Sequence, residues 1–455
     1  MDIEGNDAAV EAALVDVDDE GFTIRGLKTV TNGFSLLPLG VLFALNFVDE
    51  FDRIAFATLI SEIRDAFGMS DDGIQALGAV TGVFGLLAAL PLGILADRTR
   101  RVRLSIAAGF LWGCAAVATG LVWAVPLLYL VRFLSGVGRV TNEVVHPSLL
   151  ADFYPRRAHP QVYGVHRLAN ATAPVAGPIA GFIGSQWSWE AAFFVLAIPT
   201  GIALAIAFRL REPERGESID PAAAALHAAQ DDIGFADARR QLFGIRTLRR
   251  LWLAAFFFGM GTLQLGNLIS LYFEKVFGLD EVGRGFVQFL LGCGTVIGLV
   301  GGSRYAASQV SAGNFSRLPV VAGAAFGPFA VGMVVLTASP LVGIAFAGAV
   351  LVAAGNGGWQ PAYFSIVGSV APPRIRSQAY AWAVLIYGSG GLAYVGLVAI
   401  FPDDGGGYRA LTITLAMLTG IAGVIGASAG RFMDDDAEAV VRDVRATLDG
   451  PASDA

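Results

Sequence analysis

The sequence predicts an all-α membrane protein with twelve transmembrane helices in two pseudo-symmetric six-helix bundles. Of the 455 residues, 55% are hydrophobic and only 15% are charged, and the mean hydropathy of +0.61 lies outside the soluble globular range. Apolar runs of spanning length recur along the chain, too long for the alternating strands of a membrane barrel. Because backbone groups in lipid must be satisfied within their own segment, we expect these runs to be helices.

The number of spans follows from the lengths of the runs. One helical crossing takes about 20 residues. The runs 104–152 and 318–373 are therefore expected to turn once each, near 123–126 and near 338–340. With the first helix, the total is twelve.

The longest break in hydrophobicity, 209–250, divides the chain six plus six. The segment 155–164 (PRRAHPQVYG) after the fourth span is echoed by 373–381 (PRIRSQAYA) after the tenth, which suggests a parallel duplication around a central path. We expect five regions: an acidic cytoplasmic N-terminal segment (1–32), an N-terminal six-helix bundle (33–211), a cytoplasmic middle loop (212–246), a C-terminal six-helix bundle (247–432) and an acidic cytoplasmic tail (433–455).

Basic residues in the short connections predict the orientation. They gather on one side of the membrane, in the segments 98–103, 156–157, 239–250 and 374–376, so this side should be cytoplasmic, with both termini. The first twenty residues are acidic, unlike a basic signal n-region, and the first helix should therefore be kept. We expect a multi-pass protein of the cell (plasma) membrane.

The first span carries charges where hydrocarbon is expected, in the stretch 46–53 (NFVDEFDR). Asp49 lies roughly 20 Å along the helix, inside a core about 30 Å thick. Charges at such depth usually face a wet interior and serve a function. Alternatively, the helix ends at Val48 and the cluster is a solvated outer end, but the apolar run 54–60 argues against this.

The fourth span carries a polar stripe. Its members recur at helical spacing, and a stripe of this period should point into the bundle because charge facing lipid is costly. They are Arg132, Gly136, Arg139, Glu143 and His146. Counted from Pro126, Arg132 lies about 9 Å and Arg139 about 20 Å from the outer edge, so Arg132 matches the depth of Asp49 better. Both stay candidate partners, and a network that only fixes packing is the alternative.

Three motifs resemble signatures of the major facilitator superfamily. The segment 93–101 (GILADRTRR) resembles Gly-x-Leu-Ala-Asp-Arg-x-Gly-Arg, although Arg100 replaces the glycine of a tight turn. The segment 132–138 (RFLSGVG) resembles Arg-x-x-x-Gly-x-Gly, which the family ties to proton coupling. The segment 173–181 (APVAGPIAG) resembles the Gly-Pro-x-x-Gly of antiporters, although helix packing alone also explains small residues and prolines.

These resemblances imply the major facilitator fold and several roles. Asp97 should act as a latch at the cytoplasmic end of the second span, holding arginines and helix ends; a plain basic loop is the alternative. The inner-gate candidates are Gly93, Asp97, Arg98 and Arg101, and the helix-packing candidates are Gly177, Pro178 and Gly181.

Two altered motifs resemble the spinster branch of the superfamily. The segment 46–50 (NFVDE) resembles Asn-Tyr/Phe-x-Asp-Arg, and 136–139 (GVGR) resembles Gly-x-Gly-Glu. The Arg of the pattern has become Glu50, and its Glu has become Arg139. Two positions that face one another would tolerate such a reversal, so we expect them to interact. The resemblance implies a proton-coupled exporter of lysolipids or similar amphiphiles.

We therefore expect a proton-coupled secondary transporter that works by alternating access and exports a small amphipathic or lipid-like molecule. A first-helix carboxylate would load the proton and an arginine would balance it, and Glu143 and His146 would relay or tune this step. The coupling candidates are Asp49, Glu50, Asp52, Arg53, Arg132, Arg139 and Glu143.

The substrate candidates are polar and aromatic residues of both bundles. Arg167 is a candidate contact for an anionic headgroup, and His166 is expected at the membrane interface. Each aromatic residue by itself would also suit simple packing. The candidates are Asn46, His146, Arg167, Gln264, Asn267, Gln288, Asn356, Trp359, Gln360, Tyr380 and Tyr387.

Two other functions stay open: a proton-coupled organic-anion symporter, and a membrane sensor that transports nothing. The sequence offers no motif of an enzyme, and its four histidines and two cysteines are too scattered for a metal site. We expect no cofactor and no nucleic-acid partner. The expected partners are membrane lipids, a small-molecule substrate and protons, and we expect a monomer. Two lysines, acidic termini and a net charge of −7 resemble proteins of salt-loving microbes.

Overall fold

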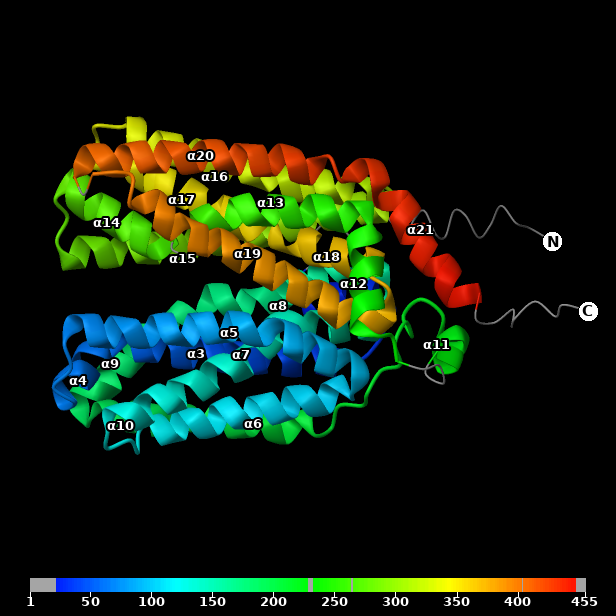
Figure 1. Cartoon of the computed structure of the whole chain (residues 1–455), viewed down its shortest axis with the longest axis horizontal. Helices are drawn as coiled ribbons and strands as arrows, with labels where there is room; N and C mark the ends of the chain where they lie inside the picture. The colour runs from blue at the N-terminus through cyan, green and yellow to red at the C-terminus, as the bar shows by residue number, and fades with distance from the viewer. Residues whose placement is uncertain (1–21, 228–231, 263–264, 403, 447–455) are drawn as a thin grey trace, which may run out of the picture.

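The computed structural model describes residues 22–227, 232–262, 265–402 and 404–446. Long helices run along one axis, and the two halves of the chain lie side by side (Figure 1). The first half consists of α3 (Leu37–Thr58), α5 (Asp71–Arg98), α6 (Arg101–Thr119), α7 (Val125–Phe153), α8 (His159–Thr172) with α9 (Ala176–Gln186), and α10 (Trp189–Ala207). The second half consists of α13 (Arg246–Thr262) with α14 (Leu265–Phe277), α15 (Glu281–Ser311), α16 (Leu318–Ala338), α17 (Val342–Gly358) with α18 (Gln360–Val370), α19 (Arg376–Val398), and α20 (Gly405–Ala427).

Shorter helices lie at the ends of the bundle. The helices α2 (Ile24–Val30) and α4 (Ile60–Ala66) flank α3, while α11 (Pro221–His227) and α12 (Phe235–Gly244) belong to the middle loop. The helix α21 (Gly430–Ala446) continues from α20 and packs through the buried side chains of Met433, Ala437, Val440 and Val444. In Figure 1, α11, α12 and α21 lie at one end, which we call the predicted cytoplasmic end.

Both turns predicted inside long apolar runs are confirmed. The helix α6 ends at Thr119 and α7 begins at Val125; α16 ends at Ala338 and α17 begins at Val342. The five-region division stays a prediction. Residues 1–21 and 447–455, which hold much of the predicted acidic segments, lie outside the described residues.

The charged first span is one continuous helix. The alternative in which it ends at Val48 is wrong, because α3 runs on to Thr58 and buries Ala55 and Phe56. Within the described residues, nine helical segments are long and apolar enough to cross a membrane. The spans formed by α3, by α7 and by α8 with α9 are not among them, and these three carry the charged residues predicted inside the first half, from Asp49 on α3 to Arg167 on α8.

The fifth span is interrupted at its predicted antiporter motif. A short 3-10 turn, η2 (Ala173–Val175), separates α8 from α9. A Cβ added at Gly177 would lie 3.3 Å from Thr58 Oγ1, and one at Gly181 would lie 3.6 Å from Thr58 Cγ2. The first contact would be tight and the second ordinary, so Gly177 favours the packing of α9 on α3, which fits the packing interpretation of this motif.

Two of the helix pairs along which the halves meet correspond to one another under the predicted duplication. The helix α5 packs on α19, and α15 packs on α8. Tyr163 of the first half and Tyr380 of the second, which occupy matching positions in the echoed segments, bring their hydroxyl oxygens within 3.1 Å. The repeat in the sequence thus appears in space as a contact between equivalent residues.

Candidate functional site

The helix α3 holds three carboxylates inside the first half. Asp49, Glu50 and Asp52 are only 2–3% exposed. Arg53, one turn beyond Glu50 on the same helix, places its Nη2 2.7 Å from Glu50 Oε2, and its own side chain is 47% exposed. Ionised groups at such depth need paired charges or hydrogen bonds, because burying an unpaired charge is costly.

The two positions with reversed charge face one another. Arg139 Nη2 on α7 donates to Glu50 Oε1 across 2.5 Å, and Arg139 Nε lies 3.6 Å from Asp49 Oδ2. The expected interaction between Glu50 and Arg139 is therefore present in the structure. Arg139 is shared between two carboxylates, and Glu50 is the closer.

Arg132 does not pair with Asp49, which corrects the depth estimate. Its Nη1 lies 3.1 Å from Asp52 Oδ2, one turn farther along α3. The guanidinium carbon lies 4.2 Å from the ring centroid of Phe56, a cation–π contact that holds the side chain toward the outer part of α3. A count of residues along the helix axis cannot include the reach of a long side chain.

Amide side chains complete the cluster, and the sequence analysis missed two of them. Asn142 Nδ2 donates to Asp49 Oδ2 at 2.8 Å, and Asn170 Nδ2 donates to Glu50 Oε1 at 2.9 Å. Asn46 Nδ2 in turn donates to Asn170 Oδ1 at 2.9 Å. Helical spacing was the available signal, because Asn142 follows Arg139 by three residues on the polar face of α7.

Arg167 links this cluster to the second half. Its Nη1 donates to Glu143 Oε1 at 2.8 Å, its Nε donates to Gln360 Oε1 at 3.0 Å, and its guanidinium lies over the ring of Phe364 at 5.2 Å. Behind Gln360, the Asn356 carbonyl accepts from Gln360 Nε2 at 3.1 Å. Glu143 is thus engaged with Arg167 and not with His146.

The two histidines of the first half form a buried pair. His146 Nδ1 and His166 Nε2 lie 3.3 Å apart, and both residues are at most 1% exposed. The expectation that His166 lies at the membrane interface is wrong, because α8 begins at His159 and carries residue 166 two turns into the bundle.

The remaining second-half candidates make contacts of other kinds. Trp359 packs on Phe258, with ring centroids 5.3 Å apart, and Tyr387 shares a hydrogen bond with Thr262 at 2.8 Å. Gln288 is exposed and donates to the Gly266 carbonyl. Asn267 lies on α14, and Gln264 lies outside the described residues. Tyr380 contacts Tyr163 near the predicted cytoplasmic end. Gln360, with Asn356 behind it, is thus the second-half candidate that we place in the charged cluster by a hydrogen bond to Arg167.

Asp97 joins the two halves at the predicted cytoplasmic end. Its two carboxylate oxygens accept from the backbone N–H groups of Ser377 at 3.0 Å and Gln378 at 2.9 Å, in the first turn of α19. A carboxylate at this place satisfies orphan N–H groups and complements the helix dipole. Asp97 thus holds a helix end of the other half, as one part of the latch prediction required.

Gly93 permits the close approach of the same two helices. A Cβ added there would lie 2.7 Å from Ala381 Cβ and 3.0 Å from the Ser377 carbonyl oxygen. Arg98 is exposed. The residues of the turn after it, Thr99 and Arg100, have φ values of −127° and −76°. Since neither is positive, this turn does not need the glycine that Arg100 replaces.

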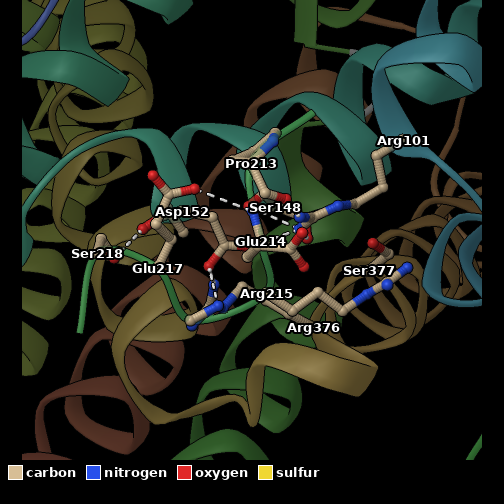
Figure 2. A network of polar contacts seen from close by, with 12 residues as sticks. Arg101, Ser148, Asp152, Pro213, Glu214, Arg215, Glu217, Ser218, Arg376 and Ser377 are labelled. Carbon is tan, nitrogen blue, oxygen red and sulfur yellow. Dashed lines mark hydrogen bonds and ion pairs between the residues drawn. The ribbon is translucent and has the colours of Figure 1, made fainter. Parts of the chain in front are cut away.

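The predicted latch arginine, Arg101, binds a different carboxylate. Arg101 Nη1 lies 2.5 Å from Asp152 Oδ2, and Arg376 Nη1 of the second half lies 2.5 Å from Asp152 Oδ1. All three residues are at most 2% exposed, and Figure 2 shows them converging. The roles of Asp152 and Arg376 were not predicted from the sequence; the available signal was that Asp152 lies just before the first echoed segment and Arg376 lies within the second.

Ser303 makes the matching contact on the other pair of crossing helices. Its Oγ on α15 donates to the Pro160 carbonyl in the first turn of α8 at 2.7 Å. Arg156 Nη2 adds a hydrogen bond to the Ser369 carbonyl at 2.6 Å. These cross-half contacts, with those of Asp97 and Arg376, close the predicted cytoplasmic end in this structure.

Comparisons with known proteins agree with this architecture. Residues 42–395 match the Major Facilitator Superfamily. The 3-(3-hydroxy-phenyl)propionate transporter of Escherichia coli (strain K12) is 30% identical over 167 residues, 35% of this chain and 40% of that protein. The sphingosine-1-phosphate transporter SPNS2 of Danio rerio is 25% identical over 195 residues, 41% of this chain and 38% of that protein. The chain thus matches less than half the length of each of these relatives.

A solved structure extends the likeness to nearly the whole fold. A crystal structure of the Escherichia coli fucose:proton symporter superposes with a TM-score of 0.70 at 14% identity, covering 87% of this chain and 98% of that one. The chain belongs to the Major Facilitator Superfamily, a family of membrane transporters, and within it resembles the spinster proteins.

Proposed function

We propose that this protein is a proton-coupled transporter that works by alternating access and carries an amphiphile bearing an acidic group. The observation that supports this most is the charge balance of the cluster. Four carboxylates stand against four arginines, so the ionised cluster is neutral overall: Asp49, Glu50, Asp52 and Glu143 against Arg53, Arg132, Arg139 and Arg167.

We propose that Asp49 is the carboxylate that binds the transported proton. Glu50, Asp52 and Glu143 each have an arginine nitrogen within 3.1 Å. Among the residues that the structure describes, the contacts of Asp49 are Arg139 Nε at 3.6 Å, on a guanidinium already bound to Glu50, and the neutral amide of Asn142. Because neutralising a carboxylate sacrifices its ion pair, the proton costs least at the residue with the weakest pair.

The charge balance also bears on the substrate. If Asp49 gains a proton, the cluster has one positive charge in excess and favours an anion. If an anion enters without a proton, the excess is negative and must be held among buried groups, which is costly. Proton and anion would therefore bind together. Arg167 is the arginine best placed for the anion, since it also contacts Gln360 of the second half.

The names of the two relatives fit this substrate class. One is named for a hydroxyphenylpropionate and the other for a sphingosine phosphate. Both compounds combine an acidic group with an apolar body. Export in exchange for protons is a second candidate, favoured by the segment 177–181, which resembles the antiporter motif. We further propose a monomer in the plasma membrane with both termini cytoplasmic, divided into the five regions expected from the sequence.

Uptake of radiolabelled 3-(3-hydroxyphenyl)propionate and sphingosine-1-phosphate into proteoliposomes tests the proposal, because one proton bound with one singly charged anion moves no net charge. We expect the uptake of at least one probe to depend on the pH gradient, and Asp49→Asn to remove that dependence. Asp65→Asn, at an exposed site on α4, is the matched control. Cotransport and exchange predict opposite effects of an inward proton gradient on uptake. A pH-dependent uptake that survives unchanged in Asp49→Asn would contradict the assignment, and the absence of uptake of both probes would contradict the substrate class.

A further inference from the structure

The chain segment that follows α10 lies directly over the closed end of the bundle. We call residues 211–218 the gate strap. Figure 2 shows several of its side chains beside Arg101, Asp152 and Arg376. Ser218 Oγ fastens its far end by donating to the Ala151 carbonyl at 2.7 Å.

The gate strap caps both helices that flank the turn at 99–100. Arg215 Nη2 donates to the carbonyls of Ala96 at 2.9 Å and Thr99 at 3.0 Å, at the C-terminal end of α5. Glu212 accepts from the backbone N–H groups of Arg101 at 2.9 Å and Val102 at 2.8 Å, at the N-terminal end of α6. The positive charge of Arg215 thus lies at the negative end of the α5 dipole, and the negative charge of Glu212 lies at the positive end of the α6 dipole. No side chain of the turn itself caps α6.

The gate strap also fixes the carboxylate that joins the halves. The Gly216 N–H donates to Asp152 Oδ1 at 3.0 Å, and this same oxygen binds Arg376 of the second half. Arg101, which binds the other oxygen, donates in addition to the Pro213 carbonyl at 3.1 Å. Asp152 is therefore held by the gate strap in the orientation in which it receives Arg376.

Gly216 is the point at which the gate strap touches the second half. Its φ of +85° lies in the left-handed region that favours glycine. A Cβ there would lie 3.2 Å from Pro373 Cγ and 3.8 Å from Val444 Cγ2. Backbone of the middle loop thus fills the space between α7, the start of α19 and α21.

We propose that the gate strap is a positioning element of the inner gate: by orienting Asp152 toward Arg376, it stabilises the state in which the predicted cytoplasmic end is closed. Opening of this end then requires Arg376 and Pro373 to leave Asp152 and Gly216. The middle loop thereby controls the gate and does more than connect the two bundles. The proposal uses the membership in the transporter family and is independent of which ion or substrate the protein carries.

Distance measurements between spin labels test it without any substrate. The labels are placed at Arg103→Cys and Asn314→Cys, exposed positions on opposite halves at this end, in a Cys114→Ala/Cys293→Ala background. In Glu212→Ala/Arg215→Ala, we expect the population with the long, open distance to rise about fivefold or more. The net loss of a single hydrogen bond would produce about this change, and this variant removes several. Glu214→Gln, an exposed change within the same segment, should leave the distribution unchanged.

A second comparison separates positioning from general stability. Asp152→Asn should also raise the open population, and adding it to the gate-strap variant should produce little further change, because both act through the same contact. Ser218→Ala, which removes one hydrogen bond, serves if the double variant does not fold. A folded gate-strap variant with the distribution of Glu214→Gln, or full additivity with Asp152→Asn, would overturn the proposal.

Discussion

Arg139 on α7 and Glu50 on α3 form an ion pair of 2.5 Å inside the first half of the bundle. Relative to the spinster pattern, both residues carry the opposite charge. Since Glu50 is only 2% exposed, a reversal of charge at either position alone would bring two like charges together in a buried site. The pair therefore explains why two separate motifs depart from the pattern together.

Exchanging the charges of Glu50 and Arg139 together should restore stability that is lost when either charge is reversed alone. Glu50→Arg and Arg139→Glu should each destabilise the protein by about 3–5 kcal/mol, the usual cost of breaking a buried ion pair. The double variant should recover part of this loss, because the pair is restored while the reversed charges now lie beside Arg53 and Asp49, whose charges are unchanged. Thermal unfolding of the purified variants measures the effect. If the double variant is as unstable as the sum of the two single variants, the pair has no energetic role.

The approach of α5 to α19 should be sensitive to one methyl group. Gly93→Ala places a Cβ 2.7 Å from Ala381 Cβ, so the helices must separate to accept it. We expect a larger population open at the predicted cytoplasmic end, measured by the labels at Arg103→Cys and Asn314→Cys. Gly82→Ala on the same helix is the control, because a Cβ there meets nothing within 4 Å. Equal distance distributions in the two variants would show that the close approach of α5 to α19 does not stabilise the closed state.

Removal of the Asp152 carboxylate should lower the stability of the folded protein and also weaken closure of the gate. In Asp152→Ala, both Arg101 and Arg376 lose the carboxylate on which they converge. We expect a loss of about 3–5 kcal/mol in the free energy of unfolding. Asp65→Ala, whose side chain is 68% exposed, should change stability little. Similar unfolding curves for the two variants would mean that water or other groups replace Asp152.

The gate strap should not act as a pH sensor at neutral pH. Arg211 donates two hydrogen bonds to Glu217, at 2.8 and 2.7 Å, and they hold the pKa of Glu217 below its usual range. A carboxyl group with a lowered pKa stabilises the folded arrangement above its ordinary pKa and loses this effect as the pH falls through the lowered value. Docking should therefore weaken only in acid.

A spin label at Glu214→Cys, an exposed position in the gate strap, reports this docking through its mobility, which should rise when the gate strap detaches. We expect constant mobility through neutral and mildly acidic pH and a rise only below the ordinary range of glutamate. Added Glu217→Gln should abolish the acid step. A mobility change near neutral pH would point to a different titrating group.

The sequence predicted the helices and the first-half cluster well because burial of charge in lipid is so costly that each charged position implies a partner. The contact between Glu50 and Arg139 followed from that cost together with the reversal of both charges relative to the spinster pattern. Asn142 and Asn170 were not predicted, because burying a neutral amide inside a span costs less free energy than burying a charge, and an amide therefore does not imply a specific partner. The pairing of Arg132 with Asp52 was missed because side-chain reach and the ring of Phe56 are not part of an axial count.

The predicted cytoplasmic end was harder to predict from sequence. Asp97 was identified by its motif, but its backbone partners at Ser377 and Gln378 lie 280 and 281 residues away and carry no side-chain signal. The gate strap lies in a charged, irregular segment that resembles a solvated loop. Its role depends on backbone groups such as the Gly216 N–H, which every residue except proline possesses.

The most direct measurement is the pH dependence of the equilibrium between open and closed states, because the central claim is that a proton on Asp49 couples to this equilibrium. Spin-label distances are recorded without substrate over a range of pH for the wild-type sequence and for Asp49→Asn. The account predicts that the wild-type distribution shifts with pH, whereas Asp49→Asn keeps one distribution, that of the protonated wild type. A variant that shifts with pH as the wild type does would contradict the account.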